Sequence, residues 1–176
     1  MLLPPLVRAA PFGAVFEWRP DTEIMKLASR VRDQDGAALI IDYGHLRSDA
    51  GDTFQAITRH SFTDPLKDPG EADVTAHVDF QALARAAEDI GALAHGPVPQ
   101  GDFLKRLGIE TRAATLMAKA SPKVSEDISA ALKRLVGGGR SGMGSMFKVL
   151  AVSEPNLTLL AGFADPQENG DKAGPP

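Results

Sequence analysis

The chain has 176 residues, a formal net charge of −4 and no cysteine. That length allows one domain with a sizeable core, and the composition is that of an ordinary globular domain. The acidic balance gives no electrostatic footprint for nucleic acid or an anionic membrane, and the lack of cysteine excludes disulfides, thiolate zinc sites and a cysteine nucleophile. No apolar run approaches the roughly 20 residues of a transmembrane helix, and the first residues do not form a signal peptide. These features predict a soluble, cytoplasmic protein.

Hydrophobic periodicity predicts an α/β chain. Strands are expected at residues 13–18, weakly, and at 37–41, 53–58, 92–100 and 146–152. Helices are expected from Thr22 to near Gly36, from Phe80 to Gly91, in two short pieces between 103 and 120, and from Pro122 onward. In the last helix the residues expected to face inward are Val124, Ile128, Ala131, Leu132 and Leu135. Residues 1–12, 59–72 and 137–144 are expected to connect these elements, and 164–176 to form a disordered tail.

The stretch around which the rest is organised is the apolar run 37–41 followed by Asp42, Tyr43, Gly44 and His45. Five apolar residues in succession are typical of a strand buried on both faces, as in a parallel sheet. Ligands bind beyond the carboxyl ends of such strands, so the polar residues would stand at the active edge, with Gly44 turning the backbone there. The alternative is a strand that ends in an ordinary turn. Few other strands are available to flank it, which suggests that part of the sheet is missing.

Polar side chains are dense in two loops, 42–52 and 71–79. If both loops lie at the same sheet edge, their carboxylates could hold a cationic group such as an arginine guanidinium. His45 or His77 could act as a base or hold a carboxylate in place. The alternative is that these are solvated loops with capping residues, and Asp79 suits an N-cap. Spacing gives no third ligand beside His77 and Asp79, so no metal site is predicted, and the glycines of 137–144 lack the context of a phosphate loop.

Several longer strings go beyond local pattern: Glu17-Trp-Arg-Pro20, Ile40-Ile-Asp-Tyr-Gly-His45, Gly51-Asp-Thr-Phe-Gln-Ala56, Asp64 to Phe80, Gly96 to Leu104, Leu107-Gly-Ile109 and Met143-Gly-x-x-Phe-Lys-Val-Leu150. In this order, from about residue 13 to about residue 163, they resemble the MidA family of S-adenosyl-L-methionine (SAM)-dependent methyltransferases. That family includes a mitochondrial assembly factor that dimethylates an arginine of a complex I subunit.

The resemblance implies a class I, Rossmann-like methyltransferase sheet with flanking helices, with SAM as cofactor. The family's glycine-rich cofactor loop and its acidic ribose-binding residue lie upstream of the part that matches here. Residues 1–163 are therefore expected to be the C-terminal part of such a domain, incomplete at its N-terminal half, and no cofactor-binding residue is assigned. The resemblance carries Asp42, Tyr43, His45, Asp73 and His77 over as catalytic candidates, and Gly44, Thr75 and Asp79 as substrate-binding candidates.

Two functions follow as hypotheses. The first is transfer of a methyl group from SAM to an arginine of a protein substrate such as a complex I-type subunit, with a homodimer among the assemblies to be expected of the enzyme. The second is a catalytically silent fragment or partner-binding module that lacks the SAM loop. Neither hypothesis involves nucleic acid, membrane or metal.

Overall fold

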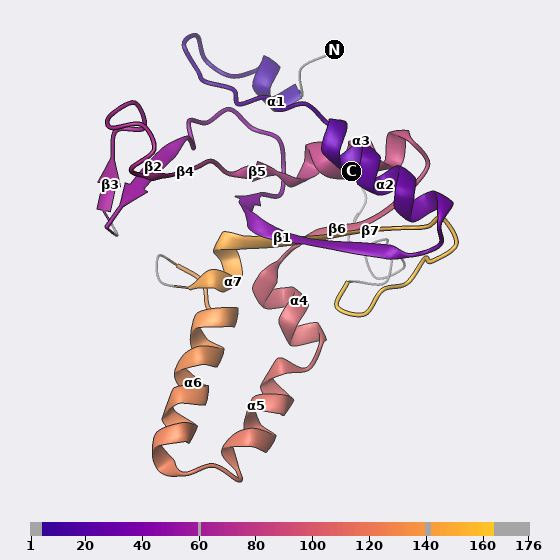
Figure 1. Ribbon diagram of the computed structural model, residues 1–176. Helices are drawn as coiled ribbons and strands as arrows, with labels where there is room; N and C mark the ends of the chain where they lie inside the picture. Colours follow the sequence, from indigo (N-terminus) through magenta and orange to yellow (C-terminus); the bar gives the residue numbers. More distant parts are fainter. Residues whose placement is uncertain (1–4, 60, 140–141, 164–176) are drawn as a thin grey trace, which may run out of the picture.

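The computed structural model describes residues 5–59, 61–139 and 142–163, so the tail expected at 164–176 lies outside the described residues. Its main feature is a four-stranded sheet with the strand order β5-β1-β7-β6 (Figure 1). These strands are β1 (Ala37–His45), β5 (Val78–Asp79), β6 (Leu93–Pro99) and β7 (Phe147–Ser153). The α/β class predicted from the sequence is confirmed.

The centre of this sheet is β7, which runs antiparallel to both β1 and β6. Its residues from Val149 to Ser153 are all buried. The prediction that β1 is buried on both faces of a parallel sheet is wrong for this structure. Ile40 packs toward the core, whereas Leu39 and Ile41, which point to the opposite face, are 51% and 45% exposed.

Two helices cover the inner face of the sheet. Helix α2 (Thr22–Asp33) buries Ile24, Ala28 and Val31, which recur at helical spacing along one face. Helix α3 (Phe80–Asp89) buries Phe80 and three alanines, and both helices pack with Leu150 and Val152 of β7 into one core. These two helices are confirmed where the sequence predicted them.

A second, small sheet has the order β3-β2-β4, made of β2 (Gln55–Thr58), β3 (Ser61–Thr63) and β4 (Asp73–Thr75). The strand predicted at 53–58 is thus confirmed in shorter form, but the connection expected at 59–72 contains β3. The strand predicted at 13–18 is wrong, because these residues have no regular structure and follow a single short helix, α1 (Pro5–Arg8). Backbone groups of this segment bond instead to a distant loop, as when Gly51 N–H donates to the carbonyl of Val15.

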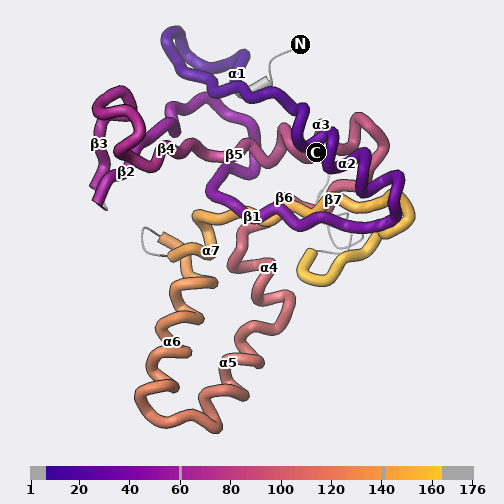
Figure 2. The backbone as a smooth tube through the Cα atoms, in the orientation of Figure 1, coloured from indigo at the N-terminus to yellow at the C-terminus, as the bar shows by residue number. Residues whose placement is uncertain are grey.

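Four helices lie between β6 and β7: α4 (Gln100–Arg106), α5 (Ile109–Met117), α6 (Pro122–Val136) and α7 (Met143–Met146). Helices α5 and α6 form an arm that extends away from the sheet, on the side opposite α2 and α3 (Figures 1 and 2). Of the residues expected to face inward on α6, Ile128, Leu132 and Leu135 are half-buried, whereas the prediction is wrong for Val124 and Ala131, which are exposed. No residue of this helix is fully buried, because α6 packs on α5 along the arm and contacts only α4 and α7 at its base. Among the helices of the described ranges, none is both long and apolar enough to cross a membrane.

A buried histidine joins the edge strand β6 and the central strand β7 to the chain that follows β7. The Nε2 atom of His95 on β6 lies 2.8 Å from the Oγ atom of Ser153 on β7, and that Oγ lies within donating distance of the carbonyls of Glu154 and Leu157. Burial lowers the pKa of His95, and a hydrogen bond to the carbonyl of Leu157 offsets only part of this effect. The folded state therefore favours neutral His95.

This histidine predicts an acid-dependent loss of stability. Below the unfolded-state pKa of about 6.5, the unfolded chain binds a proton at this position before the folded chain does, so the free energy of unfolding falls as pH falls. The stabilisation is complete above that pH and is lost toward the lower folded-state pKa. Urea unfolding of wild type and His95→Gln between pH 5 and 8 should show a shallower slope in the variant. Equal slopes would contradict this origin of the pH dependence.

Candidate functional site

The site is built where β5 approaches the carboxyl end of β1. The two strands run parallel there, with Gly44 opposite Val78 and His45 opposite Asp79. The turn predicted at Gly44 is wrong, because β1 continues through His45. Gly44 serves a different purpose, since a Cβ atom at this position would lie 2.2 Å from the carbonyl oxygen of Val78 and 2.7 Å from the ring of Phe80. The missing side chain lets β5 come close enough to place its polar residues beside those of β1.

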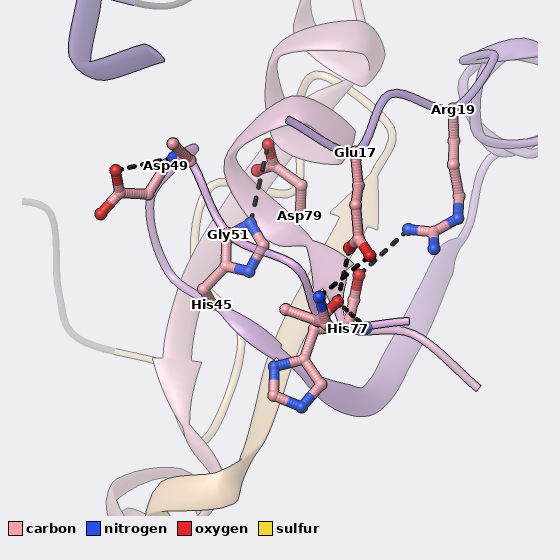
Figure 3. Close-up of a pocket in the computed structure, with 9 residues that line it drawn as sticks. Glu17, Arg19, His45, Asp49, Gly51, His77 and Asp79 are labelled. Carbon is pink, nitrogen blue, oxygen red and sulfur yellow. Dashed lines mark hydrogen bonds and ion pairs between the residues drawn. The ribbon is translucent and has the colours of Figure 1, made fainter. Parts of the chain in front are cut away.

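A hollow of about 250 Å³ lies at this junction, and the two polar loops both contribute to it (Figure 3). Three of the residues expected at the site, His45, His77 and Asp79, line it together. The full lining is Glu17, Arg19, His45, Asp49, Ala50, Gly51, Thr53, His77 and Asp79. The predicted site required both polar loops to lie at the same edge of the sheet. These three residues, which come from the two loops, do lie together there.

A hydrogen-bonded chain ties three distant segments into the wall of the hollow. The carboxylate of Glu17 accepts from the backbone N–H of Thr53 at 3.0 Å and from its hydroxyl at 2.5 Å. The same hydroxyl oxygen accepts from the N–H of His77 at 2.9 Å, and the guanidinium of Arg19 donates to the carbonyl of His77 at 3.1 Å. The segment at 17–19, which has no regular structure, is held in place by these contacts.

The carboxylates of the hollow are not equivalent. Burial alone would raise the pKa of Glu17, but the hydrogen bonds from Thr53 and Phe54 together with the nearby Arg19 outweigh it, so this pKa is lowered and the group is held as a carboxylate. Asp79 caps α3, because its Oδ1 atom accepts from the N–H of Ala82 at 3.0 Å. Its other oxygen lies 3.9 Å from Nε2 of His45. Asp79 is therefore both a cap and a member of the site.

A second, wider hollow of about 990 Å³ adjoins the first, since both are lined by Glu17, Arg19 and Asp79. It contains the site candidates Asp42, Tyr43 and Thr75. Asp73 lines neither hollow. The inclusion of Asp73 in the cleft is not supported, because it lies exposed on β4, where pairing opposite Ile57 of β2 carries it into the small sheet.

Sequence reasoning missed Glu17, Arg19, Asp49 and Thr53 as lining residues. Glu17 and Arg19 lie in one of the strings that carry the family resemblance, and Thr53 lies in another. Residue type and spacing could not reveal their role, because the partners Glu17 and Thr53 are 36 positions apart and meet through loops.

The described residues do not supply the binding loop of a dinucleotide- or nucleoside-type cofactor. The glycines near residues 137–144 follow helix α6 and lead into α7, so they do not connect a strand to a helix as such loops do. In the described ranges no group of three or more histidine or acidic side chains is placed to hold a metal ion. The polar groups at the carboxyl end of β1 suit an organic ligand with hydrogen-bond donors or positive charge.

An α/β sheet with a polar hollow at the carboxyl ends of its parallel strands defines a ligand-binding α/β protein. Residues 3–98 match the model of the Methyltransf_28 family of S-adenosyl-L-methionine-dependent methyltransferases. The chain therefore belongs to this family, which confirms the predicted resemblance and the SAM cofactor of the family.

Named relatives agree with this assignment. The protein arginine methyltransferase NDUFAF7 homolog, mitochondrial, of Drosophila melanogaster is 41% identical over 133 residues, which are 75% of this chain and 30% of the relative. Human NDUFAF7, also a mitochondrial protein arginine methyltransferase, is 33% identical over 167 residues, covering 83% of this chain and 37% of that protein. A COG1565 superfamily structure from Burkholderia thailandensis bound to S-adenosyl-homocysteine has a TM-score of 0.65 and 29% identity, covering 82% of this chain and 38% of that one.

Two consequences follow from these comparisons. The chain spans about a third of the length of the relatives it matches. The prediction of a cytoplasmic protein is contradicted, because the names of these relatives place them in mitochondria. Composition and the lack of cysteine do not distinguish a cytoplasmic protein from a mitochondrial one, because proteins without disulfides occur in both compartments.

The hydrogen-bonded chain through Thr53 gives a prediction. Thr53→Val keeps the shape of the side chain but removes the hydroxyl, leaving the N–H of His77 and one oxygen of Glu17 without this partner. We expect a loss of about 1–2 kcal/mol in the free energy of unfolding and faster hydrogen exchange at the His77 amide. Thr53→Ser, the matched control, keeps the hydroxyl and should retain the protection of that amide. Equal amide protection in both variants would show that the hydroxyl does not hold His77.

Proposed function

We propose that this chain provides the acceptor side of a SAM-dependent protein arginine methyltransferase, with the hollow of about 250 Å³ binding the arginine side chain of a protein substrate. The observation that carries the proposal is the convergence of Glu17, Asp49 and Asp79 on this one hollow, in a chain of a methyltransferase family. The arginine methyltransferase names of the relatives supply the substrate class.

The carboxylates suit a guanidinium because it is planar, always charged and donates pairs of hydrogen bonds to carboxylate oxygens. Glu17 already accepts from Thr53 with both of its oxygens, so its main role is to fix the wall of the hollow. Asp49 uses one oxygen for the N–H of Ala50, and Asp79 uses one for Ala82, which leaves the second oxygen of each for a ligand. His45, beside Asp79, then orients this carboxylate or accepts a proton from the arginine as it is methylated.

The wider hollow accommodates the rest of the substrate. Tyr43, Thr75 and Asp42 line it, so the polypeptide on either side of the target arginine would lie across the end of β1 and along β4. Peptide segments bind such surfaces through backbone hydrogen bonds and side-chain contacts. The methyl donor enters from outside the described residues, which form the arginine side of the site only.

Asp79 provides the test of the acceptor site. Asp79→Asn removes the negative charge but keeps a side chain that caps helices well, so the fold should be preserved. NMR titration measures the affinity of the 176-residue chain for a short peptide with a single arginine. This affinity should be about tenfold lower in the variant than in wild type, as expected for a lost charge-assisted hydrogen bond.

Two comparisons make this result specific. Asp73→Asn carries the same change of charge outside both hollows and should leave the affinity for the peptide unchanged. The peptide with lysine in place of arginine should bind wild type less tightly. Equal weakening by Asp73→Asn and Asp79→Asn would contradict the assignment, since it would show a general effect of net charge.

A further inference from the structure

The small sheet ends in a strand that leads directly into the candidate site. Strand β4 pairs antiparallel with β2 through Asp73, Val74 and Thr75, and all three residues are exposed. In the part of the chain that the structure describes, β4 is an edge strand, because the order of this sheet is β3-β2-β4. The chain then continues through His77 of the hollow to β5, so β4 and the site lie on one stretch (Figure 1). An extended polypeptide that pairs with β4 would therefore have one end at the hollow.

The wider hollow runs along this strand. Val74, Thr75 and Ala76 all line it, and so does Phe54, which precedes β2. Phe54 and Val74 are each 51% exposed, so apolar side chains are available to a segment beside β4. An edge strand offers N–H and C=O groups to such a segment, and extended polypeptides bind to edges of this kind as a further strand. The substrate polypeptide proposed above can therefore pair with β4 through its backbone.

The loop that joins β3 to β4 is acidic. Residues 64–71 contain Asp64, Asp68 and Glu71 against one cation, Lys67, and all four side chains are exposed. Among the described residues no ion pair neutralises these carboxylates. Leu66 of the same loop is 84% exposed, so apolar contact is available there too. A polypeptide that passes the start of β4 meets an excess of negative charge, which favours lysine or arginine at that point.

Strand direction decides which part of the substrate meets the loop. Strand β4 runs toward the hollow, and antiparallel pairs are the commoner and slightly the more stable kind. An antiparallel segment whose target arginine lies in the hollow therefore carries the residues after that arginine along β4 toward the loop. From His77 to Asp73 an extended chain covers about 13 Å, at roughly 3.3 Å per residue, so the loop is reached about five positions after the arginine.

We infer that β4 binds the substrate polypeptide as an added antiparallel strand, and that the acidic loop 64–71 selects substrates with basic residues from about five positions after the target arginine. The inference rests on the proposed function and deepens it, since it names the segment of the substrate that is recognised and its charge. Backbone pairing gives affinity for any extended sequence, whereas the carboxylates of the loop distinguish one substrate from another.

Backbone-modified peptides test the added strand. The probe is a peptide with one arginine and no other charged side chain, titrated by NMR against the 176-residue chain. In an added strand only alternate N–H groups point to β4, so N-methylation at two successive positions along the paired segment should give unequal results. One modification should weaken binding at least about tenfold, because it removes a hydrogen bond and blocks the approach of the strand, and the other should have little effect. Equal effects at both positions would overturn the inference.

Lysine-containing peptides test the acidic loop. Two lysines, at the fifth and seventh positions after the arginine, should tighten binding about fivefold at low ionic strength and less in high salt. Asp68→Asn combined with Glu71→Gln should abolish this gain. The pair leaves the bond from Asp64 to Leu66 intact, and asparagine tolerates the positive φ of 47° at position 68. Glu110→Gln combined with Glu126→Gln, at exposed positions of α5 and α6, is the matched control and should retain the gain.

The outcomes separate the alternatives. An equal gain from lysines placed before the arginine, or a gain that survives the loop variant, would overturn the inference. Self-association of the chain through β4 that excludes the peptide would overturn it in favour of a homodimer. Citrulline in place of arginine distinguishes this surface from the acceptor hollow, since it removes only the charge of the guanidinium. Equal affinity for the two peptides, with the N-methyl and lysine effects retained, would support the added strand and refute the acceptor hollow. Dependence on arginine without those effects would do the reverse.

Discussion

The close approach of β5 to β1 is the constraint on which the rest of the site depends. It is possible only because Gly44 has no side chain, as any Cβ there would collide with the backbone of Val78 and the ring of Phe80. Phe80 is itself fully buried and begins α3, so the same contact fixes the start of that helix against the core. One small residue thus sets the register in which His45 meets Asp79 and the point at which the core ends and the site begins.

From this junction the site extends through loops that have little structure of their own. The segment at 17–19 and the loop around Thr53 meet through Glu17, whose pKa is lowered because hydrogen bonds to its charged form outweigh its burial. This arrangement holds His77 in place through its backbone, at both N–H and carbonyl, while within the described residues its imidazole ring takes no part in the network. The walls of the hollow are therefore fixed by backbone contacts, while Asp49 and Asp79 each use one oxygen for a nearby N–H and the other oxygen of Asp79 faces His45.

Local patterns predicted the elements whose stabilising contacts are close in sequence. Helix α3 was found from its apolar stripe and from Asp79, whose side chain reaches only to Ala82. The strands β6 and β7 were found in the same way. Local sequence patterns failed where the residues in contact are far apart in the sequence. The segment at 13–18 alternates weakly enough to suggest a strand but bonds to the loop at 51–53. The stripe of α6 indicates burial, although only other helices of the arm and its base, α4, α5 and α7, lie against it. Glu17 could not be recognised for the same reason, since its role exists only through Thr53.

The wrong prediction for β1 carries information of another kind. Five successive apolar residues from Ala37 to Ile41 are typical of a strand covered on both faces, yet Leu39 and Ile41 are exposed in this structure. A sequence records the surroundings in which the protein works, and an isolated β1 would be a site of non-specific pairing with other chains. A neighbouring strand along the edge of β1 that does not pair with β7 would give this run the double burial that its composition indicates.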